Sequence, residues 1–217
     1  MIHYGGVARV EHLPSADEIS ALPTFTEDNP LTILVSACLL GVPCGVDATS
    51  YGAPFQHTER LFGLPNVRTV AFCPEDSAFG TPRGTPDIHG GTGVDVLDGT
   101  ARVLSDSGED WTEPMIRAAH VMLAVAERNG VHLAVLTDIS AACGSEVIYR
   151  GARSNGAHQA GQGVCAALLI RNGIKVISQR DYRTLGRLIH KLDPSFGPDP
   201  AARDHHQSEW YIGQFGS

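Results

Sequence analysis

The sequence predicts an α/β domain with a mostly parallel sheet, helices on both faces, and an extension at each end. The first observation is that a helix, an Asn-Gly pair and a strand follow one another at 112–138 and again at 163–178. Such a pair is half of the right-handed crossover unit that joins parallel strands. The second is that apolar runs at 31–35, 67–72 and 131–139 each lead into a loop that carries a cysteine. Together they place one domain at 31–180, between an N-terminal extension (1–30) and a C-terminal helix and tail (181–217).

The first half of the chain is expected to alternate strands with loops. Residues 1–30 contain three prolines and no sustained hydrophobic period, so only a short helix is expected there, at 16–22. A first strand at 32–37 precedes a loop at 38–50, whose glycines and proline predict a tight turn rather than a helix. A helix at 58–62 then leads to the second strand, at 67–72.

The stretch between the second strand and the long helix is expected to be irregular. Residues 76–91 are dense in glycine and proline and predict a long loop, which in a compact domain is usually functional or disordered. In 92–104, Asp98-Gly99 separates two alternating runs and predicts a β-hairpin outside the parallel sheet. The glycines at 90, 91 and 93 are not expected to open a helix, so they give little support to a nucleotide-binding loop.

The second half has the clearest helical periods. Thr112 is expected to cap a helix that ends at Asn129-Gly130, and the third strand follows at 131–138. A second helix after Gly163 leads to the fourth strand, at 174–178. A terminal helix is expected at 181–192. His205-His206, with His190 upstream, are candidate metal ligands, but their Pro-rich polar surroundings favour a solvated tail.

Composition favours an ordinary globular protein that acts on a small molecule. Hydrophobic residues make up 42% and charged residues 18%, and no run reaches the roughly 20 apolar residues that span a bilayer. No secretory signal is recognisable, so we expect a cytoplasmic location. The formal net charge of -8 would repel a phosphate backbone, which argues against nucleic acid as the partner.

The cysteines are the candidate site. Without a signal peptide, five cysteines favour metal binding or catalysis over a disulfide framework. Cys38, Cys73 and Cys143 each follow a strand, and the carboxyl ends of parallel strands meet at one edge of the sheet. Three or four thiolates select iron-sulfur clusters, zinc or copper(I), although the long separations do not match the usual C-x2-4-C pairs of structural zinc. The alternative is that the cysteines are small buried hydrophobes.

Two cysteines stand apart from that set. Cys165 lies among alanines and leucines of a predicted helix, which indicates a core residue. Cys44 is a candidate fourth ligand, a reactive thiol or a loop residue, and the spacing does not choose between them.

Three polar residues near the predicted thiol site are candidates for chemistry. Glu75, two residues after Cys73, is a candidate proton donor or acceptor, or else a solvated acid or helix cap. Ser140 is a candidate contact for substrate or metal, and otherwise a hydroxyl that forms a turn. Arg83 is a candidate contact for a polar substrate group, although an exposed loop arginine needs no function.

Separated motifs occur in the same order as in a known family, from 31 to 179. They are Ser36-Ala37-Cys38-Leu39-Leu40-Gly41, Asp47, Phe72-Cys73-Pro74-Glu75, Thr81-Pro82-Arg83, Gly108-Glu109-Asp110, Cys143-Gly144-Ser145, Gly163-Val164, Ala166-Ala167-Leu168-Leu169 and Asn172-Gly173-Ile174. With these motifs the chain resembles the thiouracil desulfidase family, formerly a domain of unknown function.

The resemblance implies a Rossmann-like domain that holds an oxygen-sensitive 4Fe-4S cluster on Cys38, Cys73 and Cys143. It implies that the remaining iron binds the sulfur of a thiocarbonyl such as 2-thiouracil, and that water replaces this sulfur without net redox, releasing hydrogen sulfide. Glu75 matches the family glutamate assigned to proton transfer, and Ser140 matches the first serine of a Ser-Pro-Ser-Cys stretch. With Arg83, Asp47 is a candidate for substrate binding.

The chain also departs from the family pattern. Gly45-Val46-Asp47-Ala48 stands in place of Arg-Tyr-Asp-Gly, and Ser140-Ala141-Ala142-Cys143 in place of Ser-Pro-Ser-Cys. The replaced groups belong to the expected pocket, so the substrate need not be thiouracil itself. The position of Cys44 varies in the family, which argues against a required ligand. A zinc-dependent hydrolase on the same thiolates, and a non-catalytic iron-sulfur module with Cys44 as fourth ligand, remain alternative functions.

Overall fold

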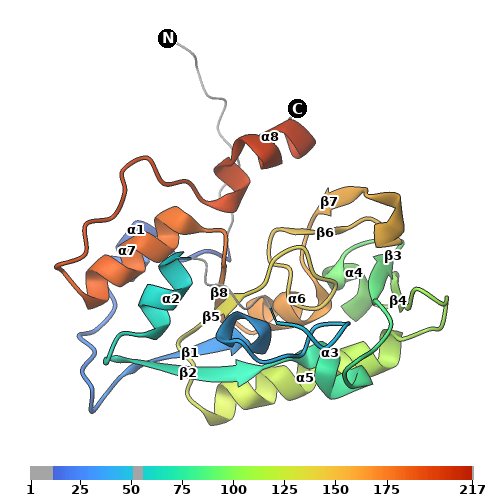
Figure 1. Cartoon of the computed structure of the whole chain (residues 1–217), viewed down its shortest axis with the longest axis horizontal. Helices are drawn as coiled ribbons and strands as arrows, with labels where there is room; N and C mark the ends of the chain where they lie inside the picture. The colour runs from blue at the N-terminus through green and yellow to red at the C-terminus, as the bar shows by residue number, and fades with distance from the viewer. Residues whose placement is uncertain (1–11, 51–55, 217) are drawn as a thin grey trace.

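The computed structural model describes residues 12–50 and 56–216, and it has the predicted α/β architecture (Figure 1). The elements of the first half are α1 (Ala16–Ser20), β1 (Leu31–Ser36), the 3-10 helix η1 (Ala37–Leu40), α2 (Gln56–Phe62), β2 (Val67–Phe72), α3 (Pro74–Phe79), β3 (Asp87–His89), α4 (Gly93–Leu97) and β4 (Arg102–Leu104). Those of the second half are α5 (Thr112–Arg128), β5 (Leu133–Leu136), β6 (Val147–Tyr149), η2 (Arg153–Asn155), β7 (His158–Ala160), α6 (Val164–Arg171), β8 (Lys175–Ser178), α7 (Tyr182–Leu192), η3 (His205–Gln207) and α8 (Glu209–Phe215).

The central sheet positions the site. Its strands are all parallel and run in the order β2-β1-β5-β8. From β1 the chain first moves to β2 on one side and later to β5 on the other, so the strand order reverses between β1 and β5. In open α/β sheets ligands bind at such a switch point, outside the carboxyl ends of the strands. The three strands that precede Cys38, Cys73 and Cys143 are therefore neighbours at this edge.

Two hydrophobic cores cover the two faces of the sheet, as predicted. Every residue of β1 is buried, which is typical of a strand covered on both sides. Its side chains alternate: Leu34 packs into one core with α5 and α6, whereas Ile33 and Val35 pack into the other with α1, α2 and α7. Figure 1 shows α1, α2 and α7 together on one side of the sheet and α3, α5 and α6 on the other.

The prediction of a β-hairpin at 92–104 is wrong for its first strand. Residues 93–97 form helix α4, because Thr92 and Asp95 make a capping box that satisfies the first backbone N–H groups of a helix. Gly93 therefore does open a helix, and the glycines at 90, 91 and 93 follow strand β3, which lies outside the parallel sheet, so the prediction for these glycines is wrong. Asp98-Gly99 is a turn as expected, and the antiparallel partner of β4 is β3, in the stretch that was predicted to be a loop.

Three further local predictions need correction. Residues 76–79 are helical, since α3 begins at Pro74, whose missing N–H costs nothing in the first turn. The turn after β1 contains η1, which ends at Gly41 in the left-handed conformation. Thr112 is the first residue of α5 rather than its cap, and its backbone N–H is bound by Asp110. The antiparallel pair β6–β7 was not predicted at all.

The C-terminal segment, residues 181–216, folds back onto the domain instead of extending from it. After α7 the chain turns back, so that α8 packs against η3 and lies near β7 (Figure 1). His205 and His206 are buried, with 5% and 7% of their surface exposed, so the expected solvated tail is wrong at these residues. The reason is long-range: buried carboxylates of a distant loop bind both rings. None of the helices in the described ranges is long and apolar enough to cross a membrane.

Candidate metal centre

A cavity of about 340 Å³ lies at the carboxyl ends of β1, β2 and β5. We call it the thiol cavity, because the side chains of Cys38, Cys44, Cys73 and Cys143 line it. The other predicted site residues line it too: Glu75, Ser140, Arg83 and Asp47. The structure therefore brings together in one place all the residues that the sequence predicted for the site.

The end of β1 is bonded to the end of β5, and this contact positions Cys38. Ser36 Oγ accepts a hydrogen bond of 3.0 Å from the backbone N–H of Thr137, which follows β5. Thr137 Oγ1 in turn lies 3.1 Å from Cys38 Sγ, within hydrogen-bond distance for sulfur. η1 then places the Cys38 thiol at the cavity wall instead of in the core.

Cys73 is the N-cap residue of α3. Its Sγ accepts a hydrogen bond of 3.4 Å from the backbone N–H of Asp76, and lies 3.8 Å from the carbonyl oxygen of Cys44. An N-cap residue has extended backbone and an acceptor side chain, and the sulfur fills the role that an oxygen usually takes. Because Cys73 ends β2 and caps α3, Glu75 falls in the first turn of the helix and lines the same cavity.

Glu75 is held between two partners. Arg83 Nη2 donates to Glu75 Oε2 at 2.8 Å, and Ser140 Oγ donates to Oε1 at 3.2 Å. The Arg83 side chain is 3% exposed and also donates through Nη1 to the carbonyl oxygens of Cys44 and Gly80. Most donors of Arg83 are therefore used within the protein, so its geometry is that of a residue that positions Glu75 and the Cys44 loop.

Ser140 organises the loop that carries Cys143, which we call the Cys143 loop (137–146). Its Oγ accepts the backbone N–H groups of Ala142 and Cys143, at 3.2 and 3.0 Å. The Ser140 hydroxyl therefore forms a turn, which was one of the two predicted roles, and it also bonds Glu75 on the cavity wall. The loop's carbonyls also accept the first N–H groups of α6, those of Val164 and Cys165.

Close backbone packing explains two glycines at this loop. A Cβ at Gly163 would lie 2.6 Å from the carbonyl oxygen of Ser140, and one at Gly144 would lie 2.6 Å from that of Val147. Neither distance is tolerable for a carbon atom, so only glycine lets α6 approach the loop this closely.

Asp138 fixes the other end of the Cys143 loop. Its Oδ1 accepts backbone N–H groups from residues 139, 145, 146 and 147, and its Oδ2 lies 2.6 Å from His205 Nδ1. The following residue, Ile139, has φ 57°, which is strained for a β-branched side chain. The Asp138 carboxylate binds the N–H of Ile139 and those of residues 145–147, and these bonds hold the strained conformation at the cavity wall.

Burial keeps the thiols protonated until a metal displaces their protons. Burial raises the pKa of the Cys73 thiol to about 12, and it raises the pKa of Cys38 and, much further, that of Cys143. Thiols of this kind are poor nucleophiles at neutral pH, because the thiolate is the reactive form. They become good ligands only when a cation compensates the thiolate charge, so metal binding suits this site better than cysteine nucleophilic catalysis.

The spacing of the sulfurs favours a cluster over a single ion. Tetrahedral zinc with Zn–S bonds of about 2.3 Å holds its sulfurs about 3.8 Å apart. Within the described ranges, no three of the four cavity thiols lie within 4.8 Å of one another. A polynuclear cluster binds each sulfur through a different metal atom and needs wider spacing. The donor set, four thiols that line one cavity, therefore suits the soft iron atoms of a cluster.

Several residues of the site were missed in the sequence. Ser36, Thr137 and Asp138 bond the strand ends and the loop, and Ile139 and Arg153 line the cavity. A signal for two of them was present, because Thr137 and Asp138 are the first polar residues after an apolar strand that leads to a cysteine. Nothing local marks Arg153, which reaches the site through its ion pair with Asp87 at 3.0 Å. Cys165, predicted to be in the core, is fully buried on α6.

Comparisons with known proteins place the chain in a family. The model of the 2-thiouracil desulfurase family matches residues 33–181. The uncharacterized protein YbbK of Bacillus subtilis (strain 168) is 40% identical over 155 residues, which cover 70% of this chain and 99% of the relative. The solved structure of the 4Fe-4S-dependent thiouracil desulfidase TudS superposes with a TM-score of 0.57 and is 35% identical, over 68% of this chain and 89% of that chain. The family match ends where the C-terminal segment begins.

Proposed function

This chain belongs to the 2-thiouracil desulfurase family, and from that premise we propose that it removes sulfur from a thiolated pyrimidine or a similar small thiocarbonyl with the help of a 4Fe-4S cluster. The observation that carries the proposal is the convergence of Cys38, Cys73 and Cys143 on one cavity at the switch point of the sheet. The likeness to a 4Fe-4S-dependent thiouracil desulfidase, at 35% identity over most of both chains, supports the same cofactor and the same class of substrate.

In the proposed site, Cys38, Cys73 and Cys143 hold the cluster. When bound through three thiolates, such a cluster supplies an iron with an open position, a Lewis acid suited to a soft sulfur atom. The reaction exchanges the sulfur of a thiocarbonyl for the oxygen of water and releases hydrogen sulfide, so it needs no external oxidant or reductant. A cavity of about 340 Å³ lies within the range of small-molecule sites.

Glu75 is the proposed proton acceptor and donor. Its carboxylate lies on the cavity wall and accepts hydrogen bonds from Arg83 and Ser140, so both oxygens are oriented. It takes a proton from the attacking water and returns it to the departing sulfur, a role that needs hydrogen-bond reach to both. Arg83 acts through Glu75, and Ser140 both orients Glu75 and shapes the Cys143 loop.

Asp47 is proposed to meet the polar edge of the substrate. It lines the cavity, and its Oδ1 accepts the Oγ1 and backbone N–H of Thr49, at 2.6 and 3.1 Å. These bonds fix the carboxylate and leave Oδ2 for a ring N–H, which suits a pyrimidine. Gly45 and Val46 line this side of the cavity where the family pattern has arginine and tyrosine, so the proposed substrate is a thiolated ring that need not be thiouracil itself.

The zinc-hydrolase alternative is disfavoured by the sulfur spacing described above. A non-catalytic iron-sulfur module would need a closed cluster with four protein ligands. Cys44 is the candidate fourth ligand, since it lines the cavity and its thiol is buried. Buried free thiols and an oxygen-sensitive cofactor suit the reducing cytoplasm, where we propose that the protein acts.

The test is anaerobic reconstitution of the full chain with iron and sulfide, followed by incubation with 2-thiouracil, 4-thiouracil and thiouridine. Released sulfide and the oxo base are measured. We expect one sulfide for each oxo base, with activity lost in Glu75→Gln at unchanged iron content. Arg102→Met, at an exposed ion pair away from the cavity, is the matched control. Reconstituted protein that carries iron and sulfide but releases no sulfide from any thiobase would contradict the proposal.

A further inference from the structure

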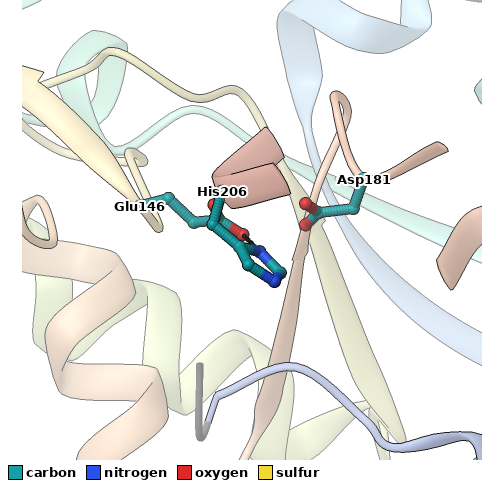
Figure 2. A group of neighbouring side chains, drawn as sticks. All are labelled: Glu146, Asp181 and His206. Carbon is teal, nitrogen blue, oxygen red and sulfur yellow. Dashed lines mark hydrogen bonds and ion pairs between the residues drawn. The ribbon is translucent and has the colours of Figure 1, made fainter. Parts of the chain in front are cut away.

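A second group of potential metal ligands lies outside the thiol cavity, where the C-terminal segment meets the Cys143 loop. It consists of Glu146 at the end of that loop, Asp181 before α7 and His206 in η3 (Figure 2). One ligand atom from each lies within 4.8 Å of the others, and all three residues are buried. Figure 2 shows the carboxylates of Glu146 and Asp181 on either side of the His206 ring. The family match at 33–181 does not include His206.

The spacing of this group suits a single ion. His206 Nδ1 lies 3.3 Å from Glu146 Oε1. An ion bound tetrahedrally at about 2.0–2.1 Å holds its nitrogen and oxygen ligands about 3.3–3.4 Å apart. The geometry therefore needs little adjustment for one metal ion to contact both atoms. Among the described residues, the cavity thiols form no such close group of three.

The charge of the region is not balanced by the protein. Four buried carboxylates gather here, and two of them are compensated: Asp138 by His205 and backbone N–H groups, and Asp204 by the N–H and Oγ1 of Thr184. Glu146 Oε2 is buried without a hydrogen-bond partner. No ion pair with lysine or arginine reaches Glu146 or Asp181 within residues 12–50 and 56–216.

Burial and the nearby charges make this arrangement costly without a cation. Burial, with the charge of Asp138, raises the pKa of Glu146 to about 8, and burial with the charge of Glu146 raises the pKa of Asp181. Asp181 accepts the backbone N–H groups of Ser178 and His205, at 2.6 and 3.0 Å, and its carboxyl group also forms a hydrogen bond with that of Glu146. A buried carboxylate pair is stable when it is bound to a metal or shares a proton.

A histidine from the opposite end of the chain gives an independent indication. His12 is 5% exposed, and its Nε2 has no hydrogen-bond partner. Its ring is close enough to Asp138 and His206 for their charges to act on it. A buried ring nitrogen without a partner is unusual, because buried polar atoms are normally satisfied.

We infer that Glu146, Asp181 and His206 form a binding site for one divalent transition-metal ion, of which zinc is the best fit. Two carboxylate oxygens and one imidazole nitrogen suit zinc, whereas magnesium and calcium prefer oxygen ligands alone. The ion ties η3 to the Cys143 loop, and through Asp138 and His205 it stabilises the loop that presents Cys143. Its role is structural, because it lies outside the thiol cavity. The inference does not depend on the proposed desulfuration.

The test uses the full chain with its cluster reconstituted anaerobically, so that the thiols are already occupied. Zinc, iron and acid-labile sulfide are measured after equilibrium dialysis against zinc. We expect one zinc ion for each chain in addition to the iron. Glu146→Gln and His206→Gln should each weaken zinc binding at least tenfold without loss of iron. His190→Gln is the matched control, since His190 lies on α7 in the same segment and binds only the carbonyl oxygen of Phe196 among the described residues.

A second measurement does not require the variants to fold. Cobalt(II) bound to the wild-type holoprotein should give the visible absorption of a site with oxygen and nitrogen ligands, without a thiolate charge-transfer band. Zinc should also slow amide exchange in η3, whereas magnesium should not. Three results would overturn the inference. The first is reconstituted wild-type protein that binds no zinc in addition to its iron. The others are a cobalt spectrum that shows thiolate ligation only, and Glu146→Gln and His206→Gln variants that bind zinc as well as wild type.

Discussion

Replacing Arg83 by methionine tests whether Glu75 depends on its buried ion pair. The change keeps an unbranched apolar stem and removes a guanidinium that is 3% exposed and lies 2.8 Å from Glu75. It also leaves the carbonyl oxygens of Cys44 and Gly80 without this donor. Removing one partner of a buried pair costs about 3–5 kcal/mol. Because the Glu75 side chain is 13% exposed and water can reach it, we expect the lower end, about 3 kcal/mol.

The assay is urea unfolding of the metal-free protein, so that loss of the cluster does not contribute to the result. Trp111 is stacked on Phe79 of α3 at 4.1 Å between ring centroids, and its fluorescence reports on this region. Glu75→Gln keeps Arg83 bonded to its carbonyls and should cost about 1–2 kcal/mol. The double variant should be more stable than the sum of the two losses predicts, because the pair is lost only once.

The matched control is Arg102→Met. Its ion pair with Asp110 is 3.4 Å long, and the two side chains are 73% and 49% exposed, so we expect about 0.5 kcal/mol or less. An Arg83→Met variant that loses no more than this control would refute the reasoning, and so would strictly additive losses in the double variant.

Three other predictions concern the elements around the site. Ser140→Ala loses the hydrogen bonds to Glu75 and to two backbone N–H groups. It should therefore lower the free energy of unfolding by about 1–2 kcal/mol, measured by thermal unfolding. It should also lower the rate of sulfide release at least tenfold in the thiobase assay. Gly163→Ala should cost about 1–3 kcal/mol, because its Cβ would lie 2.6 Å from the carbonyl oxygen of Ser140, whereas Gly197→Ala, with open space around it, should change little; equal losses would contradict the packing account. Burial lowers the pKa of His12 to about 4 in the folded protein, whereas the unfolded chain has the ordinary value of about 6.5. As the pH falls from 6.5 to 4, the unfolded chain therefore binds a proton that the folded protein does not. The free energy of unfolding should fall by up to about 3 kcal/mol over this range. The measurement is unfolding of EDTA-treated wild type and His12→Gln at each pH, and this loss should be absent from the variant. Identical pH profiles of the two proteins would contradict the prediction.

The parallel core and the thiol cavity could be predicted from the sequence because both follow from short-range patterns. An apolar strand that ends in a cysteine loop can be recognised within ten residues, and the geometry of parallel sheets brings such loops together. Cys38, Cys73 and Cys143 were found in this way, and all three line the cavity. Glu75 and Ser140 were found by their positions near those cysteines, and the family motifs added Asp47.

The errors arose where capping or long-range contacts decide the structure. Residues 94–97 alternate like a strand, but the capping box of Thr92 and Asp95 makes them a helix. His205 and His206 have polar, Pro-rich neighbours, yet they are buried by Asp138 and Glu146, about sixty residues earlier in the chain. No local sequence pattern predicts a contact between residues so far apart in the chain. A metal site at His205-His206 was set aside in favour of a solvated tail for the same reason, since Glu146 and Asp181 come from separate elements.

The central claim is that thiols from three neighbouring strand ends hold one iron-sulfur cluster. The most direct measurement is the content of iron and acid-labile sulfide in anaerobically reconstituted Cys38→Ala, Cys73→Ala and Cys143→Ala. Cys165→Ala is the control, because Cys165 is buried in the core outside the cavity. The account predicts that each of the three variants loses the cluster and that the control keeps about four irons and four sulfides per chain. Wild-type iron and sulfide in all three cavity variants would contradict it.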